Sequence, residues 1–260
     1  MKLEVLVSAV EKDAAALLSK MNIATDAVLV NQCDRYGYET LSVPNGTARC
    51  FSMPERGVGL SRNTALLHAS GEQVLFSDED IVLSSDYAEK VMDAYRALPD
   101  ADLILFNVKV APARRTYWNR SICRVTWKNY GRYPAYSISA KLSSLRRANV
   151  HYSLLFGGGA KYSNGEDSLF LRDCLRAGLT VYAHTACIGE EKERPSTWFN
   201  GYTEKFFHDR GVLYHHLYGG LARPLALRFL LVHRKEMCRE ISIKKAYRIM
   251  CEGVREAKGG

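Results

Sequence analysis

Three consecutive carboxylates, Asp78, Glu79 and Asp80, directly follow the apolar run QVLF at residues 73–76. In open α/β sheets, ligands bind beyond the carboxyl ends of the strands. Carboxylates this close repel one another, and a divalent cation with oxygen ligands relieves the repulsion and can bridge a diphosphate. The cluster therefore predicts a cation site. The alternative is a solvated loop that caps the next helix.

A second acidic pair, Glu166 and Asp167, follows Gly165 at the expected start of a helix. A carboxylate there is stabilised by the exposed N–H groups of the first turn, so simple capping is one interpretation. The other is a general base that deprotonates an attacking hydroxyl. The preceding glycines, residues 157–159, would let the backbone approach a ligand closely. The segment lacks the full GxxxxGK[ST] pattern and is not a Walker A loop.

Arg62 lies in the segment GVGLSRN at residues 57–63. The GxG in this segment follows an irregular loop instead of the first strand, and no third glycine fits, so a dinucleotide fingerprint is rejected. Arg62 at the start of a helix can contact a diphosphate or form a surface salt bridge.

Strand and helix patterns alternate about every twelve residues, which is typical of βαβ units with a mainly parallel sheet. The segment 111–150 is less regular, and its short β-type runs indicate added strands or an insertion on the substrate side. After Pro195 the pattern turns helical and basic. We therefore expect an α/β domain over residues 1–195 and a C-terminal helical extension over 196–260. The expected strands are 1–10, 26–32, 38–43, 73–76, 102–110 and 179–184, and the expected helices are 13–21, 60–69, 86–97 and 165–177.

The composition is that of a globular protein: 260 residues, 47% apolar and 25% charged. It excludes intrinsic disorder, collagen and a coiled coil as descriptions of the whole chain. The chain contains no run of about 18 uncharged apolar residues, so we expect no transmembrane helix. The first residues lack a signal-peptide pattern. The seven cysteines form no CxxC pair, which favours free thiols in a reducing cytoplasm.

The net charge of +8 is unevenly distributed, because residues 103–165 contain basic side chains and no acidic ones. Chance with a basic surface stripe and binding of phosphates are the two main explanations. Interleaved aromatic residues also allow single-stranded nucleic acid. Residues 221–258 form a second basic segment with an amphipathic pattern. Such a segment can lie on an anionic membrane surface or be an ordinary helical pair packed on the core.

Four motifs in order resemble the family 2-like inverting glycosyltransferases of the GT-A fold. They are the first strand VLVSAVEKD, the helix start at 59–63, the acids at 78–80 and the Glu166–Asp167 pair. The resemblance covers about residues 1–190. The segments FGGGAKYSNGEDSLF (156–170), STWF (196–199) and FFHDRG (206–211) resemble a bacterial subgroup of polysaccharide glycosyltransferases.

The resemblance implies an α/β GT-A fold with a mixed, Rossmann-like sheet, a nucleotide-diphospho-sugar donor and Mn²⁺ or Mg²⁺. Asp80 would contact the metal, and Asp78 the metal or the ribose. Asp167 would be the catalytic base, with Glu166 as its neighbour or substitute. The remaining donor contacts would be made by Ser8 and Ala9 at the nucleobase and Arg62 at the diphosphate.

The chain departs from the family pattern at two places. The aspartate that reads uracil is replaced by Asn31, whose amide offers both a donor and an acceptor to a base. The processive Q-x-x-R-W motif is missing, so we expect transfer of a single sugar. His184 is the natural third metal ligand, although a core or surface histidine is the commoner case. Candidates for the acceptor or sugar pocket are Gly158, Gly159, Lys161 and Trp198, and Trp198 can instead pack the C-terminal helices.

These observations predict a metal-dependent inverting glycosyltransferase that uses a UDP-sugar, on the cytoplasmic side and peripheral on the inner face of the membrane. The expected acceptor is a saccharide or lipid-linked hydroxyl in bacterial surface-polysaccharide synthesis, and no nucleic acid partner is expected. A nucleotidyltransferase would need a glycine-rich basic loop after the first strand, where the chain has SAVEKDAAA. A non-catalytic nucleic-acid-binding protein would leave the clustered acids unexplained.

Overall fold

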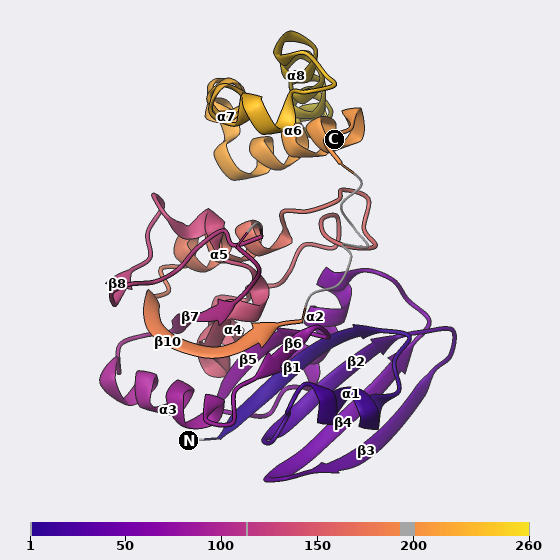
Figure 1. Ribbon diagram of the computed structural model, residues 1–260, viewed down its shortest axis with the longest axis vertical. Coiled ribbons are helices and arrows are strands. Elements are labelled where there is room, and N and C mark those ends of the chain that lie inside the picture. Colours follow the sequence, from indigo (N-terminus) through magenta and orange to yellow (C-terminus); the bar gives the residue numbers. More distant parts are fainter. Residues whose placement is uncertain (1, 113, 193–200, 260) are drawn as a thin grey trace.

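The computed structural model describes residues 2–112, 114–192 and 201–259 (Figure 1). In these residues ten strands form one mixed sheet, in the order β3-β4-β2-β1-β5-β9-β7-β10-β6, with β8 paired to β10. The strands are β1 (Leu3–Val10), β2 (Asp26–Gln32), β3 (Gly37–Val43), β4 (Gly46–Met53), β5 (Gln73–Asp78), β6 (Ile81–Leu83), β7 (Leu103–Lys109), β8 (Cys123–Arg124), β9 (Ile138–Lys141) and β10 (Val181–Glu191).

Strands β4, β2, β1 and β5 are parallel neighbours, whereas β3, β9 and β6 run antiparallel to the strands beside them. Val10 pairs with Gln32 and Ser8 pairs with Asp78, so the carboxyl ends of β1, β2 and β5 meet at one edge. These strands are buried on both faces, which explains their continuous apolar runs. The predicted mixed α/β architecture is confirmed.

Helices cover both faces of the sheet. Leu17 and Tyr87, from α1 (Ala14–Lys20) and α3 (Tyr87–Ala97), belong to the apolar core on one face. The core on the other face includes Ala65, Leu145 and Phe170, from α2 (Val58–His68), α4 (Leu142–Ala148) and α5 (Glu166–Arg176). The two cores fix the strand ends from both sides.

The last helices form a bundle above the sheet domain (Figure 1). They are α6 (Glu204–Tyr218), α7 (Ala222–Met237) and α8 (Ile243–Gly259), and they share an apolar cluster that includes Phe207, Leu230 and Met250. A further cluster joins Val212 and Leu213 of α6 to Leu169 of α5, Phe156 and Tyr162. The bundle is therefore packed against the segment that carries the acidic pair. No helix in the described ranges is long and apolar enough to cross a membrane.

The structure adds elements that the sequence pattern did not predict. Strand β4 occupies a segment without a predicted strand, and the short β6 follows the acidic cluster directly. Strand β10 extends to Glu191, beyond the predicted end at 184, and its pairing with β7 shifts register twice. These shifts break the period-two pattern that a sequence reading depends on.

Candidate active site

A cleft of about 520 Å³ opens at the carboxyl ends of β1, β2 and β5. Its lining draws on the strand ends, on α2, on the glycine-rich segment before α5 and on the end of β10. The lining residues are Ser8, Val10, Lys12, Gln32, Val58, Arg62, Asp78, Glu79, Asp80, Arg114, Tyr136, Gly158, Ser163, Asn164, Glu166 and Glu191. The predicted acidic cluster and Glu166 of the acidic pair thus reach the same cleft from distant parts of the chain.

Arg62 joins the two acidic groups. Its guanidinium donates to Asp78 Oδ1 at 2.9 Å, to Asp167 Oδ1 at 2.9 Å and to Glu166 Oε1 at 3.3 Å. The residue is only 4% exposed, and the guanidinium carbon lies 5.1 Å from the centre of the Tyr152 ring. Burial alone would lower the pKa of Arg62, but the three carboxylates keep it well above its ordinary value. The interpretation of Arg62 as a surface salt bridge is therefore wrong, because the ion pairs form in the interior.

Asp167 lies directly behind the cleft lining, on Arg62, and its carboxyl group has a strongly raised pKa. Burial, together with the charge of neighbouring Glu166, raises the pKa of Asp167 to about 8, and Arg62 counteracts part of that rise. One cation cannot fully compensate three carboxylates, so one of them retains its proton near neutral pH. A carboxyl group with a pKa near the working pH suits proton transfer in either direction.

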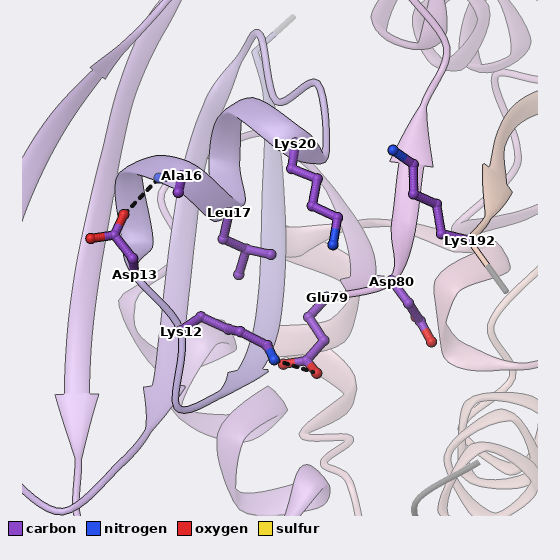
Figure 2. A pocket seen from close by; sticks show the side chains of 8 residues that line it. All are labelled: Lys12, Asp13, Ala16, Leu17, Lys20, Glu79, Asp80 and Lys192. Carbon is purple, nitrogen blue, oxygen red and sulfur yellow. Dashed lines mark hydrogen bonds and ion pairs between the residues drawn. The ribbon is translucent and has the colours of Figure 1, made fainter. Parts of the chain in front are cut away.

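Glu79, the middle residue of the acidic cluster, has different surroundings from Asp80. Glu79 Oε2 accepts a hydrogen bond from the Val10 amide at 2.7 Å, and Oε1 lies 3.6 Å from Lys12 Nζ. Figure 2 shows this ion pair at the edge of a neighbouring pocket of about 280 Å³. The Asp80 carbonyl accepts from the Lys192 amide at 2.8 Å, which ties the acidic loop to the end of β10. Asp80 borders both the cleft and this pocket.

The oxygen ligands suit a hard divalent cation. Among the described residues, no three His, Cys, Asp or Glu side chains gather around one point. Mg²⁺ is commonly held by one or two carboxylates together with substrate phosphates, so such a set is not required. Asp78 and Asp80 fit that arrangement because both line the cleft. Asp78 Oδ1 also accepts a hydrogen bond from Arg62, and Glu79 is engaged by the end of β1.

The structure does not bring His184 to this place. The residue lies within β10 and is not among the residues that line the cleft. Its Nδ1 accepts from the Ala186 amide at 3.1 Å, and its ring centre lies 5.5 Å from that of Phe106. Burial lowers its pKa. The expectation of His184 as a metal ligand is not supported by this geometry, and the packing interpretation describes the residue better.

Of the three residues predicted to contact the nucleobase, one lines the cleft and two do not. Ser8 lines the cleft, and its hydroxyl lies 2.9 Å from the Ser61 hydroxyl. Ala9 belongs to the apolar core and is 1% exposed. The Asn31 amide binds the backbone of Lys12 twice, as acceptor at 3.1 Å and donor at 2.7 Å. Asn31 therefore holds the loop after β1, which leaves its amide committed to the protein and not to a base.

Gln32 lines the cleft where Asn31 does not, and the sequence analysis missed it. Its Oε1 accepts from the Gly57 amide at 2.7 Å. The alternation of side chains along β2 is the signal that separates the two residues, since only one of them can face the cleft. Arg114, Tyr136 and Glu191 were missed as well, and Arg114 pairs with Glu191 at 2.8 Å.

The glycine-rich segment closes one side of the cleft. The Gly158 carbonyl accepts from the Val58 amide at 2.9 Å. Gly159 has a φ of +80°, and a Cβ there would lie 2.9 Å from the Gly57 nitrogen, so only glycine fits. Lys161 does not line the cleft and pairs with Glu256 of α8 at 2.9 Å. Trp198 lies outside the described residues.

Comparison with known proteins agrees with this geometry. Residues 37–151 match the family model described as glycosyl transferase family 2. No curated protein sequence matches the chain. Among solved structures, Staphylococcus aureus TarS 1–349 in complex with UDP-GlcNAc has a TM-score of 0.63 at 16% identity, covering 92% of this chain and 74% of that one.

Residues 37–151 of the chain are thus a glycosyl transferase family 2 region.

Two further TarS structures have a fold similar to that of this chain. The complex of TarS 1–349 with UDP has a TM-score of 0.61 at 16% identity and covers 98% of this chain and 82% of that one. The longer S. aureus TarS chain has a TM-score of 0.59 at 15% identity, with 94% of this chain and 46% of that one covered. At such identities the likeness shows the GT-A fold alone.

Proposed function

We propose that this glycosyltransferase transfers a single sugar from a UDP-sugar to a hydroxyl acceptor, with inversion and with Mn²⁺ or Mg²⁺. The observation that carries the proposal is the junction of Asp78, Glu166 and Asp167 on Arg62 within one cleft. The acids of the donor side and the perturbed base candidate are thereby held at a fixed spacing. Structures of similar fold in complex with UDP-GlcNAc and with UDP support a nucleotide-diphospho-sugar donor.

The protein's part in the reaction follows from the environments of its carboxyl groups. Asp167 in its ionised form accepts the proton of the acceptor hydroxyl as that oxygen attacks the anomeric carbon. The attack comes from the face opposite the leaving diphosphate, so one displacement inverts the configuration. Glu166 shares the Arg62 guanidinium and keeps the pKa of Asp167 high. Arg62 fixes the direction of the Asp167 carboxylate.

Asp78 and Asp80 would hold the divalent cation. When bound, the cation would neutralise charge on the leaving diphosphate. Gln32 and Ser8 stand at the ends of β2 and β1, where a nucleoside would meet the cleft. Gly158 and Gly159 allow the sugar to approach the backbone closely.

The acceptor is proposed to be a saccharide or a lipid-linked saccharide of bacterial surface-polysaccharide synthesis, reached from the cytoplasmic face of the membrane. Basic side chains of the acid-free stretch support no nucleic acid site, because several pair with acids elsewhere. Examples are Arg114 with Glu191, Arg124 with Asp100 and Lys161 with Glu256. We also keep the division into a domain over 1–195 and an extension over 196–260 as a proposal.

Calorimetry with a panel of nucleoside diphosphates, with and without Mn²⁺, tests the donor site. We expect binding of UDP that requires the metal and is lost in Asp80→Asn. Asp34→Asn serves as the matched control, because the Asp34 side chain is 90% exposed and its ion pair within the described residues is with Arg35, which is also exposed. Absence of binding to every nucleotide by folded protein would overturn the proposal.

A further inference from the structure

Helix α7 has two apolar faces, and only one is covered. Ala222, Ala226 and Leu230 are buried against the other helices of the bundle. Leu227, Leu231 and Val232 point outward and are 40%, 51% and 63% exposed, and Leu221 in the preceding turn is 65% exposed. Four large apolar side chains on one short stretch exceed the scattered exposure that is ordinary for a surface.

The same stretch is strongly basic. Residues 210–235 contain no Asp or Glu. Arg223, Arg228, Arg234 and Lys235 are exposed, and none of them forms an ion pair with any described part of the chain. The side of α7 that is not buried in the bundle therefore carries four cations without an ion pair in the described part of the chain.

The helical repeat arranges these side chains in order. Pro224, Leu227 and Leu231 are three and four positions apart, so they line up along the open face. Arg228 and Lys235, seven apart, follow one edge of this line, and Arg223 and Arg234, eleven apart, follow the other. We call this surface the α7 basic face: Leu221, Arg223, Pro224, Leu227, Arg228, Leu231, Val232, Arg234 and Lys235.

We propose that the α7 basic face docks on an anionic lipid membrane, with the helix lying in the plane of the interface. An apolar line between rows of Arg and Lys matches both layers of such a surface, since the apolar side chains enter the acyl boundary and the cations meet the headgroups. A second copy of the chain fits less well, because its own α7 basic face would bring like charges together. The proposal deepens the proposed function by naming the surface on which a lipid-linked acceptor is met.

The docking surface is fixed relative to the active site. Asp209 of α6 accepts from the Ser163 amide at 2.9 Å and from its hydroxyl at 2.6 Å. Glu256 of α8 accepts from the Tyr162 hydroxyl at 2.7 Å. Ser163 itself lines the cleft. A bundle held on a membrane would therefore hold the cleft at a constant orientation to that membrane.

Co-sedimentation of the full chain with vesicles tests the proposal without donor or acceptor. We expect binding to vesicles of phosphatidylglycerol and phosphatidylcholine in equal parts, and none to pure phosphatidylcholine. The double variant Arg228→Gln/Lys235→Gln should lower the partition coefficient about 25-fold, at roughly fivefold per lost charge. Leu227→Gln/Leu231→Gln should lower it at least tenfold. Leu67→Gln, at a site on α2 that is 76% exposed, is the matched control and should bind as wild type does.

Failure of wild type to bind the anionic vesicles would overturn the proposal, as would unchanged binding by both double variants. A wild-type dimer in sedimentation equilibrium that becomes a monomer in Leu227→Gln/Leu231→Gln, without vesicle binding, would assign the face to a second copy instead. Calorimetry with UDP and Mn²⁺ on the same variants keeps the two proposals separate, because the α7 basic face is no part of the cleft. Retained UDP binding with lost vesicle binding supports both.

Discussion

The Arg62 guanidinium and the Asp167 carboxylate are 2.9 Å apart, and the other terminal nitrogen of Arg62 lies 2.9 Å from Asp78 in the lining of the cleft. The arginine therefore contacts the donor-side acid and the base candidate at once. A change in the charge at Asp78 should therefore change the pKa of Asp167, because both carboxylates share the Arg62 cation. Residues from α2, β5 and α5 take part, so the site forms only when the sheet domain is folded.

Arg62→Ala should abolish transfer and destabilise the protein. It leaves three carboxylates without their cation, and loss of one partner from a buried ion pair costs about 3–5 kcal/mol. Arg62→Lys retains the charge but cannot donate to three groups in a planar fork, so we expect an intermediate loss of stability. Urea unfolding measures the free energies of unfolding. Arg35→Ala is the control, because Arg35 is exposed and its ion pair within the described residues is with the equally exposed Asp34. Equal stability of wild type and Arg62→Ala would contradict the structure.

Asp167→Asn should lower kcat by about 10²–10⁴, the usual contribution of a general base. Wild-type kcat/KM should rise with pH through about 8, where burial and Glu166 place the pKa of Asp167. The rising limb should be missing from the residual activity of the variant. A pH–rate profile with unchanged shape in Asp167→Asn would assign the base elsewhere.

The same substitution has a pH-dependent effect on stability. The folded-state pKa of Asp167 is raised above its unfolded value of about 3.9, so the folded state binds the proton more tightly. This contribution to stability is fully present below pH 4 and is lost as pH rises through 8. Asp167→Asn removes the cost of ionisation, so its melting temperature should exceed that of wild type more at pH 9 than at pH 5. Thermal unfolding at both values, with Asp34→Asn as control, measures the difference.

Asp80→Asn and Glu79→Gln should separate the roles of neighbouring acids. Glu79 is used by the Val10 amide and Lys12, so Glu79→Gln should lower stability by about 1 kcal/mol and retain metal-dependent nucleotide binding. Asp80→Asn should lose that binding. Calorimetry and urea unfolding on both variants decide the assignment, and a reversed pattern would make Glu79 the metal ligand.

Asp209→Asn should weaken the tie between α6 and the cleft. The Asp209 carboxylate accepts two hydrogen bonds from Ser163 and pairs with Lys205 at 2.6 Å. Its ion pair and hydrogen bonds outweigh burial and lower its pKa, so its stabilising charge is present above the unfolded pKa of about 3.9 and lost at lower pH. We expect a KM for the acceptor raised several-fold with little change in UDP affinity. Unchanged acceptor KM would show that the Ser163 loop holds its position without α6.

The sequence was sufficient for the architecture of the sheet domain because its central strands are buried on both faces and carry continuous apolar runs. Strand β4 was missed since only Ala48 and Cys50 of its residues are buried, and these small residues give a weak alternation. The acids of the cleft were found because one group directly follows a buried strand and the other opens a helix, and because their order along the chain resembles a known family.

The finer roles required three-dimensional information. Asn31 and Gln32 are adjacent in sequence, and the pleat decides which one faces the cleft. Arg62 was predicted to contact a diphosphate or to form a salt bridge, but its three acidic partners lie 16, 104 and 105 positions away in the sequence. No local pattern can report such a junction. His184 lies on a strand with register shifts, and there the alternation of side chains no longer follows from position in the sequence.

The hydrogen bond from Tyr162 to Glu256 spans 94 positions of sequence and connects the last turns of α8 to the glycine-rich segment. A substitution or truncation at residue 256 should therefore alter the position of the glycine-rich segment beside the cleft, although helix ends usually tolerate change. In a mutational scan for activity, substitutions in this stretch of α8 should lower activity about as much as substitutions around Gly158. Swapping the helical bundle between related enzymes without its matching loop should then give folded but poorly active chimaeras.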